Sequence, residues 1–382
     1  MGAREGRDIA SSLKDDLLAL SRDIHSHPEL AYHERRAVER IADVLGRNGH
    51  KVELSLGGVG TAFRARVGPP GPSVALLAEY DALPEIGHAC GHNLIAMTNA
   101  GAFLVAARQA DRLEVGIELV GTPAEESGGG KIDLIDRGVF RHTVAALSSH
   151  PSGGIAWECG TTSLGVVVKR AGFRGAAAHA AYSPHEGRNA LNGVIRLFVG
   201  VDGWRQHLPG DARVHGIVTK GGAAQNIVPE FAEAVFGLRA RTIEELRGME
   251  TMFGDIARGA ALQTGTEVAI TDEMRLYAPT KPNARLAELL MDEMRQRGLD
   301  PKTGDVVMAS TDFGNVSQVV PADYIGFPVN AQPIPGHSHV MREASASDLA
   351  HRNALTVIDV LASAAVRIAT DASLRSELMR GR

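Results

Sequence analysis

This chain has few cysteines, and neither positive nor negative charge dominates it. It has two cysteines in 382 residues, Cys90 and Cys159, which is too few for the disulfide framework of a secreted domain. Its 40 basic side chains nearly balance 45 acidic ones, for a net charge of −5, so nothing points to nucleic acid or an anionic membrane as a partner. We therefore expect a reducing, cytoplasmic environment.

Long apolar runs are absent as well. No uninterrupted run reaches the roughly 18 residues that cross a bilayer, and residues 1–16 are charged, without the apolar centre of a signal peptide. We therefore expect a soluble protein with no membrane contact. The apolar content, 44%, is ordinary for a globular protein and sufficient for a full core. A chain of this length is expected to form two domains.

A stretch rich in metal-binding residue types follows a predicted buried strand, Val74–Ala78. Residues 79–93 (EYDALPEIGHACGHN) combine carboxylates, two histidines and a cysteine. Ligand sites of open α/β sheets lie just outside the carboxyl ends of strands, and this donor set suits a zinc-like or manganese-like ion. Cys90 and His92 can point to the same side of the chain. Taken alone, a buried free cysteine beside a surface histidine explains that pair better.

Two further predicted strands end in the same way. The strand Val115–Gly121 is followed by Glu125 and Glu126 and then three glycines, and residues 144–150 end on His150 before Pro-Ser-Gly-Gly. Adjacent carboxylates face different ways, so one can bind metal while the other addresses a water beside it. Taken alone, a solvated acidic turn is the better interpretation of the pair, although the glycines allow close backbone approach. The three strand ends together favour a metal site.

The pattern of predicted elements changes after residue 162. Residues 163–274 show the order strand-helix-strand-strand-helix-strand, which is the ferredoxin-like split motif. We therefore expect an inserted α+β domain at 163–274, between two parts of a first domain at 1–162 and 275–382. Outside the insertion, apolar spacing predicts helices at 8–26, 34–45 and 93–107, and a closing helix to residue 370 that Ser345 or Ser347 caps.

Eight motifs in order resemble those of the metal-dependent amidohydrolases related to aminoacylases and carboxypeptidase G. The cysteine-containing branch of p-aminobenzoyl-glutamate hydrolase and the aminoacylase-like dipeptidases is the most similar. The motifs are HSHPELAYHE (25–34), EYDALPEIGHACGHN (79–93), GTPAEESGGGK (121–131), SSHP (148–151), GAAAHAAYSPHEGRNAL (175–191), QNIVPE (225–230), ASTDFGNVS (309–317) and PGHSH (335–339).

The resemblance implies an α/β fold with a catalytic three-layer αβα sandwich around a mostly parallel mixed sheet. The insertion would be a lid that also forms a homodimer contact. It implies two divalent metal ions per chain, for which manganese or zinc is expected in preference to cobalt or nickel. The implied ligands, with Cys90 bridging the ions as thiolate, are Cys90, His92, Glu126, His150 and His337.

The resemblance also implies the reaction, which is hydrolysis of an N-acyl or N-aroyl amino acid, or of a dipeptide with a free carboxylate. Glu125 would be the general base that takes a proton from the attacking water, and Asp81 would orient an imidazole ligand. His179 would stabilise the oxyanion in a neighbouring active site, although alone it reads as a surface histidine.

The same resemblance implies which residues hold the substrate. Asn226 and Arg239 would bind the free carboxylate, for which a guanidinium is well shaped. Arg239 could equally be an ion-paired strand residue. Asp312, in Ser-Thr-Asp, would line the acyl pocket.

Three positions depart from the pattern of many relatives or leave a choice open. Glu79 stands where many relatives have a ligand histidine, so its role is open, and Asn93 stands where many have Asp. His337 and His339 compete for the last ligand position. We assign His337 because the ligand of the family directly precedes serine.

Two other functions stay open from the sequence. The first is a thiol hydrolase with Cys90 as nucleophile and His92 or His88 as base, which leaves the other predicted ligands without a task. The second is an inactive relative that binds amino acid conjugates. Sensitivity to chelators separates the thiol enzyme from the metal enzyme, and turnover of a chromogenic N-acyl amino acid separates both from the inactive relative.

Overall fold

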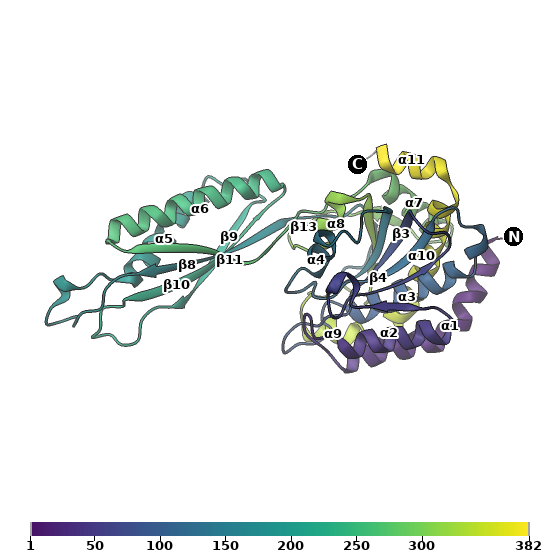
Figure 1. Ribbon diagram of the computed structural model, residues 1–382, viewed down its shortest axis with the longest axis horizontal. Helices are drawn as coiled ribbons and strands as arrows, with labels where there is room; N and C mark the ends of the chain where they lie inside the picture. Colours follow the sequence, from purple (N-terminus) through teal and green to yellow (C-terminus); the bar gives the residue numbers. More distant parts are fainter. Residues whose placement is uncertain (1, 381–382) are drawn as a thin grey trace. The chain divides into compact units, whose positions relative to one another are not determined.

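The chain forms two compact units (Figure 1). The computed structural model describes residues 2–380, with side chains from residue 13 onward. The first unit comprises Met1–Thr162, Thr280–Val306 and Asp312–Arg382, and the second comprises Ser163–Pro279 with Val307–Thr311. The chain thus returns to the first unit at 280, where the sequence pattern placed the return at 275. The lid and dimer roles of the second unit stay predictions.

An eight-stranded mixed sheet forms the centre of the first unit. Four adjacent strands at its middle, β4, β3, β5 and β14, run parallel, while β2 and β6 pair antiparallel with their inner neighbours. The prediction of a mostly parallel α/β sheet is confirmed. In spatial order the strands are β1 (Val52–Leu54), β2 (Phe63–Val67), β4 (Gly116–Gly121), β3 (Ser73–Ala78), β5 (Thr143–Ser152), β14 (Ala322–Pro328), β6 (Trp157–Cys159) and β12 (Pro301–Thr303).

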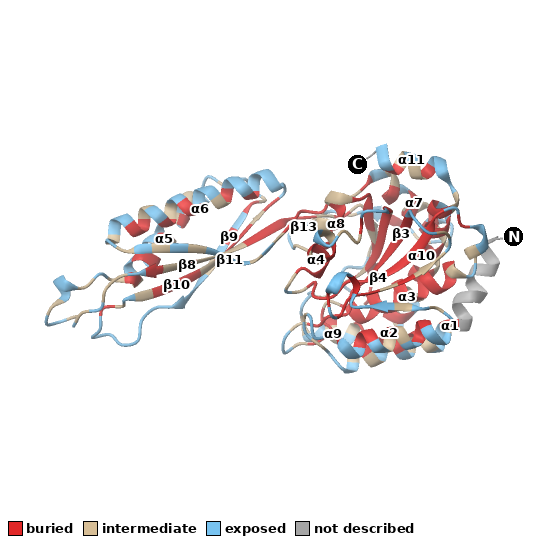
Figure 2. Cartoon of the chain, viewed as in Figure 1, coloured by how far each residue is buried: buried red, intermediate tan, exposed pale blue. Residues whose placement is uncertain are grey.

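Helices cover both faces of this sheet, so β3 is buried along its whole length (Figure 2). Val74 and Leu76 pack in the core on the side of α3 and α10, whereas Ala75 and Leu77 pack in a second core with residues of α4 and α8. The helices are α1 (Gly2–Ser26), α2 (Arg35–Arg47), α3 (His92–Ala107), α4 (Gly130–Asp136), α7 (Ala284–Arg295), α8 (Phe313–Val319), α9 (His339–Ala344), α10 (Asp348–Thr370) and α11 (Ala372–Arg380), with 3-10 turns at Leu56–Gly58 and Ala110–Arg112.

The closing helix α10 has the length and apolarity of a membrane span, which the search for uninterrupted apolar runs had not indicated. It is the one such helix in the described part of the chain, and 61% of its most apolar window is buried inside the protein. It packs against α3 and α1, so its apolar surface is covered by the core of the first unit. Ser347, one of the two predicted caps, accepts a hydrogen bond from Ala350 N at its start.

The second unit is a four-stranded antiparallel sheet with the strand order β11-β8-β10-β9. This order with the sequence β-α-β-β-α-β is the predicted ferredoxin-like arrangement. Thr242 begins α6 with a capping box to Glu245. The elements are β8 (Gly165–Arg174), α5 (Ala190–Arg205), β9 (Arg213–Lys220), β10 (Phe231–Ala240), α6 (Ile243–Thr264) and β11 (Glu267–Tyr277), with a 3-10 turn at Pro184–Glu186.

Residues 305–313 contain a strand of only two residues. β13 (Val306–Val307) pairs with β7 (Thr162–Ser163) as a separate two-stranded sheet. The remaining residues up to Asp312 are in no regular element.

Asp323 at the start of β14 allows a test of stability against pH. Its carboxylate is buried and accepts hydrogen bonds from Gly160 N and Tyr324 N. Burial raises the pKa of Asp323 from 3.8 to about 7. A carboxyl with a raised pKa in the folded state costs stability as pH rises from its unfolded pKa through its folded pKa. We therefore expect Asp323→Asn to gain about 1–3 kcal/mol of unfolding free energy relative to wild type between pH 5 and pH 8.

Urea unfolding at the two pH values measures this difference. The exposed Asp202→Asn variant is the matched control and should show no change with pH. A difference for Asp323→Asn that is the same at pH 5 and pH 8 would contradict a raised pKa.

Candidate metal centre

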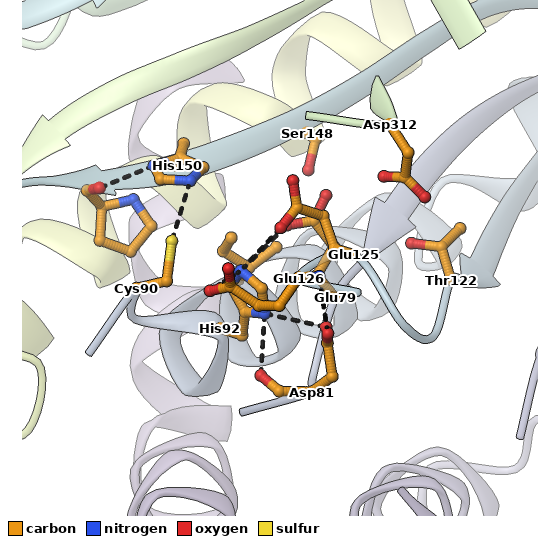
Figure 3. A network of polar contacts seen from close by, with 12 residues as sticks. Glu79, Asp81, Cys90, His92, Thr122, Glu125, Glu126, Ser148, His150 and Asp312 are labelled. Atoms are coloured by element: carbon orange, nitrogen blue, oxygen red, sulfur yellow. Dashed lines mark hydrogen bonds and ion pairs between the residues drawn. The ribbon is translucent and has the colours of Figure 1, made fainter. Parts of the chain in front are cut away.

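Four of the five predicted ligands, Cys90, His92, Glu126 and His150, gather where the parallel strands end (Figure 3). Because β3, β4 and β5 run parallel, the segments after them meet at one edge of the sheet. Asp81 follows β3, Cys90 and His92 stand at the start of α3, Glu125 and Glu126 follow β4, and His150 lies near the end of β5.

Two groups of potential ligand atoms share Cys90. In each group, Cys90–His92–His150 and Cys90–Glu126–His337, the atoms lie within 4.8 Å of one another. Cys90 Sγ is 3.5 Å from His150 Nε2, and His337 Nε2 is 3.8 Å from Glu126 Oε1. The two groups place Cys90 between both sets of potential ligands, and two ions bridged by its thiolate stay a prediction.

His92 is oriented by Asp81. Its Nδ1 lies 2.8 Å from the Asp81 carbonyl oxygen and 3.0 Å from Asp81 Oδ1, so the ring donates its proton there. Burial would lower the pKa of His92, but the charges of Asp81 and Cys90 and the hydrogen bonds to them together raise this pKa well above its usual value. Nε2 faces the carboxylates of the cluster. The role of Asp81 in orienting this ring toward a metal stays a prediction.

The residues present fit a divalent cation. Several buried side-chain atoms of the described residues have no hydrogen-bond partner, and three of them face one another at this cluster: Glu79 Oε2, His92 Nε2 and Glu126 Oε1. His92 Nε2 lies 3.6 Å from the first oxygen and 3.8 Å from the second. Unpaired buried polar atoms are costly, and the converging sulfur, nitrogen and carboxylate donors suit zinc-like or manganese-like ions.

Negative charge is concentrated around this cluster. Burial, reinforced by Glu79 and Glu126, raises the pKa of Glu125 well above its usual value. Burial likewise raises the pKa of Glu126 and of the Cys90 thiol. A cation among these groups would act against such shifts by favouring their ionised forms.

A buried lysine that the sequence reasoning did not single out lies behind the cluster. Lys131 on α4 is fully buried, and its Nζ is 2.8 Å from Glu79 Oε1 and 2.5 Å from Asp312 Oδ1. Its backbone N–H donates to Asp312 Oδ2 at 3.0 Å. Both oxygens of Asp312 are thus engaged and the residue has no exposed surface. The predicted role of Asp312 in the acyl pocket does not fit this geometry.

His337 fits the last ligand position better than His339. The backbone N–H of His337 donates to Ala89 O, next to Cys90, at 3.2 Å. His339 begins α9 and belongs to none of the ligand groups found in the described part of the chain. The geometry favours the residue chosen from the sequence.

The three predicted residues of the inserted segment lie in the second unit. The exposed His179 accepts N–H bonds at Nδ1 from Ala181 and Tyr182, and Asn226 O accepts from Ala180 N, so the loops of His179 and Asn226 lie side by side.

Arg239, on β10, is half-buried and donates to Ser310 Oγ at 2.7 Å. This bond replaces the strand ion pair that we considered from the sequence. The roles of His179, Asn226 and Arg239 toward substrate stay predictions.

Comparison with known proteins agrees with this centre. The model of peptidase family M20/M25/M40 matches residues 75–363. The Xaa-Arg dipeptidase of Mus musculus is 37% identical over 96% of this chain and 88% of its own length. A p-aminobenzoyl-glutamate hydrolase chain from Escherichia coli is 28% identical over 93% of this chain and 89% of its own length.

Solved structures show the same fold at low sequence identity. A dinuclear metal binding peptidase of the M20 family from Bacillus subtilis is 18% identical, with a TM-score of 0.69 over 91% of this chain and 98% of its own. An aminobenzoyl-glutamate utilization protein from Klebsiella pneumoniae is 19% identical, with a TM-score of 0.71 over 94% of this chain and 97% of its own. The family match and the converging ligands lead to one conclusion: this chain belongs to peptidase family M20/M25/M40 and is a metal-dependent amide hydrolase.

Proposed function

We propose that this chain is a binuclear metal hydrolase that cleaves the amide bond of a dipeptide, or of an N-acyl or N-aroyl amino acid, with a free carboxylate. The observation that carries the proposal is the pair of ligand groups that share Cys90, with the Glu125 carboxylate 3.8 Å from His92 Nε2. The names of two relatives, a Xaa-Arg dipeptidase and a p-aminobenzoyl-glutamate hydrolase, support the substrate class.

Five residues of the first unit would hold the two ions. Cys90, His92 and His150 would hold one ion, and Cys90, Glu126 and His337 the other. When bound, such ions supply Lewis-acid polarisation of the amide carbonyl and of water.

Glu125 takes the proton of the attacking water and delivers it to the leaving nitrogen. Asp81 keeps His92 in the tautomer with Nε2 free. In the second unit, His179 stabilises the oxyanion, and Asn226 and Arg239 bind the carboxylate of the substrate.

The second unit supports the proposal of a homodimer. Its sheet ends in the edge strand β9, on which Ile217 and Val218 are 65% and 48% exposed, and Ile195 and Val199 are exposed on α5. Apolar side chains exposed together are typical of an interaction surface. Light scattering after gel filtration should give twice the chain mass. Manganese or zinc as the metal, and the cytoplasm as the compartment, complete the proposal.

Metal content and activity, measured together, test the function. The protein is purified without chelator, its metals are counted by plasma mass spectrometry, and Xaa-Arg dipeptides, N-acyl amino acids and p-aminobenzoyl-glutamate are assayed before and after chelation. We expect two metals per chain, and activity that is lost on chelation and returns with manganese or zinc.

Two results would contradict the proposal. Activity that survives in fully stripped protein would favour Cys90 as nucleophile, with His92 or His88 as the base. Bound metal without turnover of any compound in the panel would favour a conjugate-binding relative.

A further inference from the structure

The loop that carries Glu125 is anchored by carboxylates of other segments. Residues 122–129 connect β4 to α4, and three backbone N–H groups between Ala124 and the start of α4 donate to buried carboxylates. Such bonds to charged acceptors are stronger than those to neutral ones. The pairs are Ala124 N to Glu34 Oε1 at 2.9 Å, Glu126 N to Asp81 Oδ2 at 2.9 Å, and Lys131 N to Asp312 Oδ2 at 3.0 Å.

Ala124, directly before Glu125, has an unfavourable backbone conformation. Its φ is +59°, in the left-handed region that disfavours residues with a Cβ. The surrounding backbone is tightly closed, because Gly129 N donates to Ala124 O at 2.9 Å and a Cβ on Gly130 would lie 2.0 Å from Pro123 O. A return of Ala124 to negative φ would turn the following peptide and redirect the Glu125 side chain.

Glu34 is fixed where it meets this loop. It lies between α1 and α2, has no exposed surface, and accepts the Thr61 hydroxyl at Oε2 at 2.7 Å. Thr61 is held in turn, because its carbonyl oxygen accepts the Tyr80 hydroxyl at 2.6 Å. Burial raises the pKa of Glu34 to about 7, so the neutral amide of glutamine is a close substitute. Glu34 belongs to none of the ligand groups described above.

We propose that Glu34 is a positioning residue for the general base: by accepting the N–H of Ala124 it holds this residue in the left-handed conformation and so directs Glu125 at the metal centre. The inference rests on the proposed function, in which Glu125 is the base. The alternative is that Glu34 only satisfies two buried donors and stabilises the fold. The two roles differ in their effect on kcat of the folded enzyme.

Substitutions of Glu34 separate the two roles. Glu34→Met removes the acceptor, and we expect kcat to fall by about 10²-fold, as for a misplacement near 1 Å, with KM and metal content unchanged. Glu34→Gln keeps an oxygen for Ala124 and should retain kcat. The matched control Thr61→Val removes the other hydrogen bond of Glu34 and should lower thermal stability but not kcat. A kcat of Glu34→Met equal to that of wild type overturns the inference.

A second substitution tests the role of the backbone conformation. Glycine adopts positive φ without the penalty that a Cβ brings. Ala124→Gly should therefore favour the left-handed conformation at position 124 even when the hydrogen bond to Glu34 is missing. We expect the double variant Glu34→Met/Ala124→Gly to recover about 10-fold in kcat over Glu34→Met. Ala124→Gly alone should stay near wild type. No recovery of kcat in the double variant counts against the inference. If Glu34 only stabilises the fold, the backbone conformation of residue 124 does not limit kcat, and glycine cannot raise it.

Hydrogen exchange gives a readout that is independent of activity. Peptides covering residues 122–131 should exchange at least about 10-fold faster in Glu34→Met than in wild type, and at the wild-type rate in Glu34→Gln. Unchanged exchange in Glu34→Met overturns the inference even if the enzyme is active. If wild type hydrolyses no compound of the panel, the proposed function fails, and the exchange rates still decide whether Glu34 holds the loop.

Discussion

Glu125→Gln should lower kcat by about 10³-fold while the protein keeps its full complement of metal. Glu125 lies outside the two ligand groups that share Cys90, although it forms a third group with His92 and Glu126, and its side chain is only 7% exposed at the same strand end. Glutamine has nearly the same shape but cannot take a proton at neutral pH. Substrate binding should survive because KM depends on other residues, so the loss should appear in kcat.

The matched control for this variant is Glu118→Gln. Glu118 is also a buried carboxylate on the same strand, β4, but it pairs with Arg66 and lies away from the strand end. We expect it to lower stability and leave kcat unchanged. Metal content that falls together with kcat in Glu125→Gln would make Glu125 a ligand, and unchanged kcat would exclude it as the base.

Lys131→Met should have the largest effect on stability, lowering the free energy of unfolding by about 3–5 kcal/mol at pH 8. The lysine is the buried cation between Glu79 and Asp312. Its removal leaves the Asp312 carboxylate without a counter-charge and takes from Glu79 its nearest cation, with His92 3.6 Å away on its other oxygen. Burial already raises the pKa of Asp312 to about 6 with the lysine present, and it would rise further without it. Both carboxyls then cost most where they are ionised, so the loss should shrink as pH falls from 8 to 5.

Denaturant unfolding at several pH values measures this loss. The exposed lysine on β12 supplies the control, Lys302→Met, which should change stability by less than about 0.5 kcal/mol. The double variant Lys131→Met/Asp312→Asn should be more stable than Lys131→Met alone, because it removes the carboxylate that is left without a counter-charge. A double variant that loses the sum of the two single effects would show that the three groups do not act as one network.

The strands and the ligand segments could be predicted because their signals are local. Buried parallel strands are continuous apolar runs, so the predicted run Val74–Ala78 located β3 to within one residue, and the segment with the first predicted ligands follows that run. The short helices α4 and α8 were not predicted, because seven residues are too few to show a helical period of apolar residues.

The buried ionic network could not be predicted. Lysine is almost always exposed, and nothing in the sequence around Lys131 indicates that two carboxylates from distant segments meet it. For the same reason Asp312 was assigned to the substrate and Glu34 was given no role. Each of these pairings joins residues about 50 to 180 positions apart, and no periodic pattern encodes such contacts.

The order of the ligands along the chain has a consequence for biosynthesis. Cys90, His92 and His150 all precede the inserted unit, whereas His337 follows it. The neighbour of β5 in the sheet, β14, is also made late. A nascent chain therefore acquires the residues of the first ligand group long before those of the second, because domains fold as they leave the ribosome, N-terminal parts first. Under the proposed binuclear function, the first ligand group would be complete before the second while the chain is still being made.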